Sequence, residues 1–188
     1  GNIVRSTDNG SSFDNVTSET VSSSIHLYGA TYGNNTFVTV GYKGTILTST
    51  DGISWTSRTS GTSVTFHDVT YGNGLYVTVG DIGTILTSSD GTSWSSTTVS
   101  GTLDDVSYGN GLYVTVGSSG TIFTSSDGST WDNRTFSTSN TFYGVIYGNG
   151  LYVTVGNSGI IFTSSDGISW TSRSSGTTVH LREVIYSQ

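Results

Sequence analysis

The sequence predicts an all-β fold built from one repeated antiparallel unit. The segment Leu-Tyr-Val-Thr-Val-Gly occupies residues 75–80, returns unchanged at 112–117 and 151–156, and has a looser copy at 36–41. No stretch shows the spacing of an amphipathic helix. A tyrosine that ends the preceding run recurs every 37 or 39 residues, at Tyr32, Tyr71, Tyr108, Tyr147 and Tyr186. A period of about forty residues with several short alternating runs is typical of β-propeller blades.

The two ends of the chain match different parts of one blade. Residues 1–8 align with residues 44–51, which form the third strand of a complete copy, and residues 181–186 align with a first strand. Pairing of these ends would close the ring and remove exposed sheet edges. We therefore expect one domain, residues 1–188, forming a five-bladed β-propeller closed by its N- and C-terminal strands. The expected blades are 27–61, 66–101, 103–137, 142–176 and a composite of 181–188 plus 1–19.

The composite blade is short by one strand. No copy of the second strand is left over for it, although Ser11–Glu19 can supply the fourth. Three alternatives stay open: the composite blade has only three strands, a neighbouring chain adds the missing strand, or the natural polypeptide continues.

Each blade is expected to contain four strands, as the second copy illustrates. The first strand, Phe66–Tyr71, should lie nearest the axis, and Asn73-Gly74 predicts a type I′ hairpin turn that needs positive φ at both residues. The second strand, 75–80, is apolar on both faces, as expected for a blade between two others. The third strand, 84–88, leads through an Asp-Gly turn to a fourth strand near Trp94.

Composition and charge exclude several classes of function. The formal net charge is −7 with only six Lys and Arg, so a nucleic-acid binder is not expected. The chain has no cysteine for disulfides or thiolate metal sites, and no apolar run long enough for membrane insertion. Its Ser, Thr, Asn and Gly content is typical of extracellular β proteins and phage tail proteins. We therefore expect an extracellular or virion-associated protein without a cofactor or metal.

The turn after each third strand carries a family resemblance. Residues 6–13, Ser-Thr-Asp-Asn-Gly-Ser-Ser-Phe, fit the pattern Ser/Thr-x-Asp-x-Gly-x-x-Trp/Phe, and residues 49–55 with three later copies are one residue shorter. The chain resembles the Asp-box, or bacterial neuraminidase repeat, propellers, which include sialidases, sortilin-type receptors and photosystem assembly factors. Similar repeats occur in phage tail and bacterial surface proteins. The resemblance implies a propeller with its functional site on the rim opposite the Asp turns.

The five turn aspartates are expected to be structural. An Asp side chain at this position caps its own turn by accepting hydrogen bonds from backbone N–H groups. This structural role is favoured over a role as a catalytic carboxylate or as a calcium ligand. The aromatic residue that ends each turn should pack between blades. The aspartates are Asp8, Asp51, Asp90, Asp127 and Asp166.

Function should lie where the copies differ, because the shared residues are needed by the fold. Two variable sets fall on the rim opposite the Asp turns, around the mouth of the central channel. They could bind a sugar or a peptide end, and the alternative is a solvated mouth whose charges pair locally. At the start of the innermost strands stand Tyr28, His67, Asp104, Tyr143, Arg182, Asp68, Asp105 and Glu183; after the second strands stand Tyr42, Lys43, Asp81 and Asn157.

An enzyme is not expected. The sialidase chemistry that the resemblance suggests needs three clustered arginines, whereas only Arg182 falls at the expected mouth. The other candidates, Arg58, Arg134 and Arg173, fall in fourth strands, and the three histidines do not align for a shared zinc.

We expect a non-catalytic binding or attachment module, such as an adhesin, that recognises a glycan or a surface protein. The alternative is a structural subunit that self-associates through the open edge of the composite blade. A sialidase-like glycosidase is the least favoured function.

Overall fold

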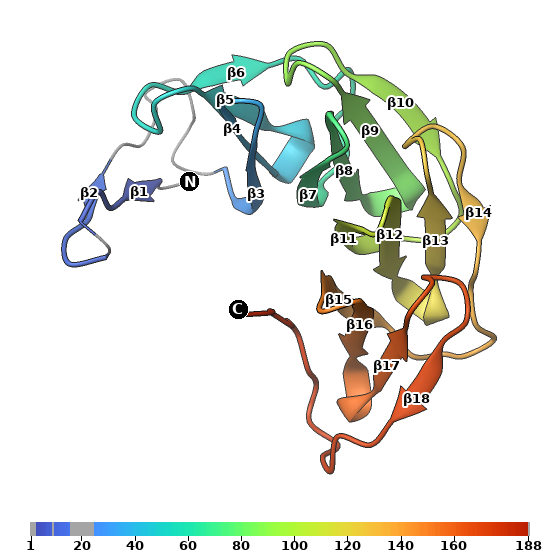
Figure 1. The fold of residues 1–188 in the computed structure, drawn as a ribbon. Coiled ribbons are helices and arrows are strands. Elements are labelled where there is room, and N and C mark those ends of the chain that lie inside the picture. The colour runs from blue at the N-terminus through green and yellow to red at the C-terminus, as the bar shows by residue number, and fades with distance from the viewer. Residues whose placement is uncertain (1–2, 9, 16–24, 188) are drawn as a thin grey trace.

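The structure is a computed structural model that describes residues 3–8, 10–15 and 25–187. Four four-stranded antiparallel sheets and one two-stranded sheet radiate from a common axis, so the predicted all-β propeller fold is confirmed (Figure 1). Blade 1 contains β3 (Leu27–Gly33), β4 (Thr36–Gly41), β5 (Ile46–Ser49) and β6 (Thr56–Arg58); blade 2 contains β7 (Phe66–Gly72), β8 (Leu75–Gly80), β9 (Thr84–Ser88) and β10 (Ser95–Thr98). Blade 3 contains β11 (Leu103–Gly109), β12 (Leu112–Gly117), β13 (Ile122–Ser125) and β14 (Asp132–Asn133); blade 4 contains β15 (Phe142–Gly148), β16 (Leu151–Gly156), β17 (Ile161–Ser164) and β18 (Thr171–Arg173). The two-stranded sheet pairs β1 (Val4–Arg5) with β2 (Asp14–Asn15).

The hairpin between the first two strands follows the predicted turn chemistry. In blade 2, Tyr71 pairs with Tyr76, and the turn residues Asn73 and Gly74 have φ values of 47° and 79°. Positive φ at both central residues is what a type I′ turn requires. After each second strand the chain makes a short 3₁₀ turn, in elements η1 (Tyr42–Gly44), η2 (Asp81–Gly83), η3 (Ser118–Gly120) and η4 (Asn157–Gly159).

Apolar side chains fill the spaces between blades. Val77 and Val79 of blade 2 pack against Leu103 and Tyr113 of blade 3, and all four are at most 1% exposed. The Tyr113 hydroxyl donates a hydrogen bond to the carbonyl oxygen of Gly72, in the hairpin of blade 2. The same contact joins blade 2 to blade 1 and blade 4 to blade 3. One interface is therefore repeated around the axis.

A glycine ends each first strand because the neighbouring blade approaches the backbone there. A Cβ on Gly72 would overlap the ring of Tyr108 in the next blade, and Gly33 and Gly109 meet tyrosines in the same way. Gly148 meets Tyr186. The repeated tyrosine therefore marks the innermost segment of the following blade, including the composite one.

The C-terminal segment differs from the expected first strand. Residues 181–187 lie along β15, with a Cβ on Gly144 placed 3.4 Å from the Glu183 Cα, but they form no regular strand. Each complete blade pairs its first strand with a second strand, and within the described residues this segment has no such partner. A strand is held by its ladder bonds, so the prediction of a strand at 181–186 is wrong.

Closure of the ring by the two termini stays a prediction. The β1–β2 hairpin and the C-terminal segment lie on the two sides of the open part of the ring (Figure 1). The expected fourth strand, Ser11–Glu19, is described up to Asn15, where β2 ends, and residues 16–19 lie outside the described part. The described residues contain no helix of the length and apolarity that crossing a bilayer requires.

Candidate binding site at the axial mouth

The starts of the innermost strands and the 3₁₀ turns meet at one rim of the ring. His67, in β7, places its Nε2 atom 2.8 Å from Oδ1 of Asp81, in η2. The Asp81 N–H also donates to the carbonyl oxygen of Thr65 at 3.0 Å, which fixes the turn against the strand start. Both predicted sets of variable residues therefore contribute to the mouth.

One side of the mouth is acidic and aromatic. The Tyr28 ring centroid lies 6.1 Å from the His67 ring and 6.4 Å from the His26 ring, and the Tyr28 side chain is exposed. The pKa of Asp104 is raised to about 6, because burial disfavours the carboxylate and the charges of Asp105 and Asp81 add to this, while His67 opposes it. This side offers carboxylates and a tyrosine face, which suit a cationic group.

The other side carries a cation. The Arg182 guanidinium lies over the Tyr143 ring, 5.2 Å from its centroid, and the His180 ring meets Tyr143 edge-on at 6.2 Å. Nδ1 of His180 accepts the Ser158 N–H at 3.0 Å. That bond leaves the His180 Nε2 atom as the N–H donor. Arg182 and His180 together present donors suited to a carboxylate or a hydroxyl-rich ligand.

Asp68 and Asp105 tie the inner strands together. Oδ2 of Asp68 accepts the Val106 N–H at 3.2 Å, and Oδ2 of Asp105 accepts the Val145 N–H at 2.6 Å, so each carboxyl reaches the next blade. The two carboxyls also hydrogen-bond each other, and burial is the main cause that raises the pKa of both. Much of their hydrogen-bonding capacity is therefore used within the ring.

The remaining candidates make mostly local contacts. Lys43 Nζ lies 5.2 Å from the centroid of the neighbouring Tyr42 ring. Oδ1 of Asn157 accepts the Thr141 N–H at 3.2 Å, which ties η4 to the residue before β15. Glu183 is exposed, and its Oε1 atom accepts the Val184 N–H at 3.3 Å. The pKa of Glu183 is raised by partial burial and by the charge of Asp105.

The sequence places His26, Ile82 and His180 in the variable loops of this rim, but they were not chosen as predicted site residues. His26 and His180 lie against Tyr28 and Tyr143. Each histidine stands two residues before a predicted site residue, Tyr28 or Arg182, and this spacing is the signal that indicates them. Ile82 is 69% exposed beside Asp81, with a φ of 51° that β-branched residues rarely adopt. The glycine that follows Ile82 is the signal that indicates this conformation. In the other blades the residue before the corresponding glycine is Lys43, Ser119 or Ser158, and each of these also has a positive φ.

The turn aspartates bond within their own turns. Oδ1 of Asp90 accepts the N–H groups of Thr92 and Ser93 at 2.7 and 2.8 Å, and the Ser88 hydroxyl donates to it at 2.9 Å. These bonds lower the pKa of Asp90. Asp8, Asp51, Asp127 and Asp166 accept hydrogen bonds in their own turns in the same manner. Trp94 donates from Nε1 to the Gly91 carbonyl oxygen at 3.2 Å.

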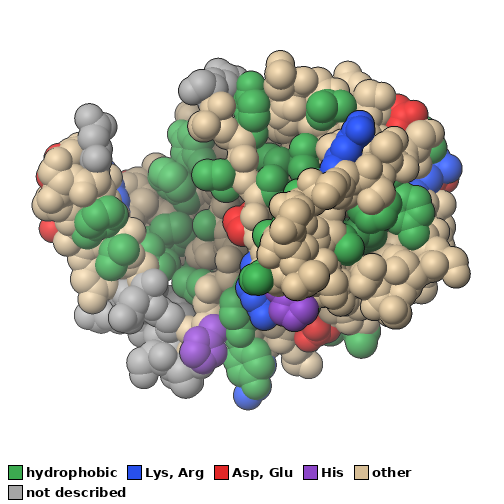
Figure 2. Space-filling view, turned by 90° about the horizontal axis from the view of Figure 1, so that it is seen from below, with side chains coloured by type: hydrophobic (Ala, Val, Ile, Leu, Met, Phe, Trp, Pro, Cys, Tyr) green, Lys and Arg blue, Asp and Glu red, His purple; other side chains and the backbone are tan. Residues whose placement is uncertain are grey.

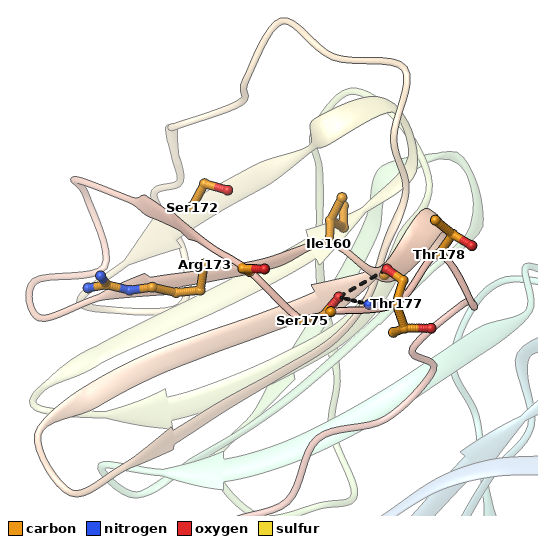
Figure 3. A pocket seen from close by; sticks show the side chains of 9 residues that line it. Ile160, Ser172, Arg173, Ser175, Thr177 and Thr178 are labelled. Atoms are coloured by element: carbon orange, nitrogen blue, oxygen red, sulfur yellow. Dashed lines mark hydrogen bonds between the residues drawn. The ribbon is translucent and has the colours of Figure 1, made fainter.

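A separate pocket at the outer edge of blade 4 offers little chemistry. It has a volume of about 600 Å³ and lies between η4 and the loop after β18 (Figure 3). Ser175 accepts the Thr177 N–H and donates to its carbonyl oxygen, and Arg173 Nε donates to the Thr163 hydroxyl at 2.9 Å. Ser60 and Thr62 form the same local bonds in blade 1, so this shape is a feature of the repeat.

No group of three or more His, Asp or Glu side chains among the described residues is arranged to hold a metal ion. The arginines that sialidase chemistry would need are also apart. Arg58, Arg134 and Arg173 each bond from Nε to a threonine of the third strand in their own blade, at the outer edge.

Comparison with known proteins shows similarity in fold. No known family profile matches the chain, and no curated protein matches it. The solved structure "YCF48 bound to D1 peptide" is 18% identical with a TM-score of 0.70, over 90% of this chain and 59% of that one. YCF48 from Cyanidioschyzon merolae is 19% identical with a TM-score of 0.68, over 88% and 61%. Sqt1 from Saccharomyces cerevisiae is 14% identical with a TM-score of 0.67, over 89% and 54%. The chain thus spans about three fifths of the length of either YCF48 structure.

Proposed function

We propose that this chain is a non-catalytic binding module that holds a segment of a protein partner at the axial mouth. The observation that carries the proposal is the division of the mouth into an acidic aromatic side, around Tyr28 and Asp104, and a cationic side, around Arg182. A peptide carries both charges and therefore fits both sides. One of the similar propellers, YCF48, has been solved with a bound peptide, which supports this class of ligand.

The finer parts of the proposal rest on the sequence. The Asp-turn pattern supports membership of the Asp-box propellers, and the Ser-, Thr- and Asn-rich composition supports a place on a cell or virion surface. A surface glycan is the second ligand class, because tyrosine faces and carboxylates also suit sugars. The separated arginines support a module without sialidase activity.

The test is a binding screen with matched variants. The chain would be probed with a displayed peptide library and a glycan array, and hits measured on Tyr28→Ala, Asp104→Asn and Arg182→Ala. We expect peptide hits whose affinity falls at least about tenfold in these variants, the effect of losing about 1.4 kcal/mol. Thr92→Ala, on the Asp-turn rim, is the control. Hits that are unaffected by the mouth variants would contradict the proposal, and hits confined to sugars would replace the peptide by a glycan.

An enzymatic function has its own check. Turnover of a fluorogenic sialoside that disappears in Arg182→Ala would show that the chain is a glycosidase. We expect no turnover by either protein.

A structural subunit is the second candidate function. The observation that favours it is the composite blade, where β1–β2 and residues 181–187 are not joined into one sheet. Light scattering over a range of protein concentrations tests self-association through this edge. A constant monomer mass at all concentrations would exclude it.

A further inference from the structure

The three complete interfaces between blades show what a finished interface needs. The preceding blade supplies valines of its second strand and an isoleucine of its third strand, such as Val77 and Ile85 of blade 2, both fully buried. The following blade supplies an apolar residue of its first strand and a second-strand tyrosine, such as Leu103 and Tyr113 of blade 3. The two interfaces of the composite blade, with blade 4 and with blade 1, can be compared with this set of residues.

On the blade 4 side the interface is half formed. Val153 and Ile161 correspond to Val77 and Ile85, yet both are only half-buried. Leu151 is 41% exposed. The apolar face of blade 4 is therefore only partly covered by the C-terminal segment.

On the blade 1 side the interface is also open. Ala30 is exposed and Leu27 half-buried, whereas their counterparts Val106 and Leu103 are buried. A pocket of about 320 Å³ opens here, lined by Ile3, Leu27, Ala30 and Trp55 among others. Figure 2 shows hydrophobic side chains in the hollow between the N-terminal hairpin and the rest of the ring.

The hairpin of blade 4 also differs from the hairpins of the other blades in its hydrogen bonding to a tyrosine hydroxyl. The Tyr152 hydroxyl reaches the hairpin of blade 3, at the carbonyl oxygens of Gly109 and Leu112. Among the described residues no tyrosine hydroxyl reaches the corresponding Gly148 and Leu151 of blade 4. Tyr186 does occupy the inner-strand place beside Gly148. Among the described residues, no strand takes the second-strand position between residues 181–187 and β1.

We propose that the space between residues 181–187 and β1, here called the strand slot, binds an extended peptide segment by strand addition. The segment has the pattern of the repeated second strand, Leu-Tyr-Val-x-Val-Gly. Its backbone would pair with residues 182–186, as second strands pair with first strands, and backbone pairing gives affinity in this mode of recognition. Its tyrosine would reach Gly148 and Leu151, and its valines would enter the pocket at Leu27 and Ala30. The slot continues an interface that the molecule builds three times.

The segment does not come from the complete blades of a second copy of the ring. The three identical copies of this strand, β8, β12 and β16, are each paired on both sides within their own blades. Their tyrosines, Tyr76, Tyr113 and Tyr152, are at most 1% exposed. Releasing one of them would break a complete blade. The inference is independent of the axial mouth.

The test is a titration with the repeat's own strand as a peptide. A fluorescein-labelled peptide Asn-Gly-Leu-Tyr-Val-Thr-Val-Gly, the sequence of residues 149–156, with a lysine at each end, would be followed by anisotropy. We expect saturable binding of one peptide per chain and slower hydrogen exchange at the amides of residues 182–186. A peptide with phenylalanine for tyrosine should bind about tenfold more weakly, because it leaves the carbonyl acceptors unfilled.

Matched protein variants locate the site. Ala30→Glu places a charge in the pocket at an exposed position that should not disturb folding, and Ser96→Glu puts the same charge on the exposed face of β10. We expect at least about a tenfold loss of peptide affinity in the first and none in the second, with equal melting temperatures. Absence of saturable binding, or equal binding by both variants, overturns the proposal. A dimer that forms without peptide and that Ala30→Glu dissociates would make the occupant a second copy and would overturn it too. Because Ala30→Glu should retain ligands of the axial mouth, the two proposals fail separately.

Discussion

The hydroxyl of Tyr113 in blade 3 donates its hydrogen bond to the carbonyl oxygen of Gly72, which ends the first strand of blade 2. The Tyr113 side chain is 1% exposed, and burial raises its pKa. A second, longer contact joins the same hydroxyl to the Leu75 carbonyl oxygen at 3.5 Å. One buried hydroxyl therefore fixes the relative position of two blades.

Removing that hydroxyl should weaken the ring. We expect Tyr113→Phe to lower the free energy of unfolding by about 1–3 kcal/mol, because the buried carbonyl of Gly72 loses a donor. Urea denaturation measures the change. Tyr108→Phe is the control, since no hydrogen bond from the Tyr108 hydroxyl is seen in the described structure, and its effect should stay within about 0.5 kcal/mol. Equal effects of the two changes would contradict this role.

Asp90 should contribute to stability and not to binding. Asp90→Ala removes the acceptor of two backbone N–H groups and one hydroxyl, so we expect a lower melting temperature. Ligand affinity at the axial mouth should be unchanged. Scanning calorimetry and a binding titration on one preparation check both. Loss of affinity at an unchanged melting temperature would give the turn a functional role.

Ile82 should be replaceable with a gain in stability. Its φ of 51° is in the left-handed region, which costs a β-branched residue about 1–2 kcal/mol. The side chain is 69% exposed, so little packing is lost. We expect Ile82→Asn to raise the free energy of unfolding by about 1 kcal/mol, because Asn tolerates this conformation. Ile82→Val, which stays β-branched, should bring no gain. If Asn and Val behave alike, backbone strain at this turn is negligible.

The carboxyls near the axis should make stability fall as pH rises. The pKa of Asp68, Asp105 and Asp104 is raised in the folded chain above the ordinary aspartate value of 3.8, to about 6 for Asp104, mainly because burial disfavours the charged form. A raised pKa means that the folded state binds the proton more tightly, so this stability is complete below 3.8 and is lost as pH rises through the folded pKa.

Asp105→Asn tests this assignment, because the amide imitates the protonated carboxyl that faces Asp68. We expect the variant to unfold with a weaker pH dependence between about pH 4 and 7 than the parent. Urea midpoints at several pH values measure it. His67, Asp81 and Glu183 also face this cluster and are unchanged in the variant. An unchanged slope would show that Asp105 does not hold the proton.

The repeated residues predicted the fold well, because each has one task in every blade. The Asn73-Gly74 turn, the strand at 75–80 and the Asp90 cap all follow from local chemistry and lie where the sequence indicated. The segment 181–186 did not form the expected strand, because strand formation depends on a partner strand that sequence periodicity alone does not guarantee.

The sequence indicated the rim on which the candidate residues lie, but not the contacts that they make there. The spacing of His67 and Asp104 before the repeated tyrosine indicated a common rim. It could not show that Asp68 and Asp105 reach the backbone of the next blade, because that contact depends on how closely two blades approach. His26 and Ile82 gain their interest from ring stacking and backbone conformation, which depend on tertiary structure.

The unit that repeats in the sequence is different from the unit that is stable. Because the acceptor for each second-strand tyrosine belongs to the previous blade, one copy cut out of the chain would lack a partner on each face. Stability should therefore rise with every neighbour added, and an isolated blade should be unfolded in water.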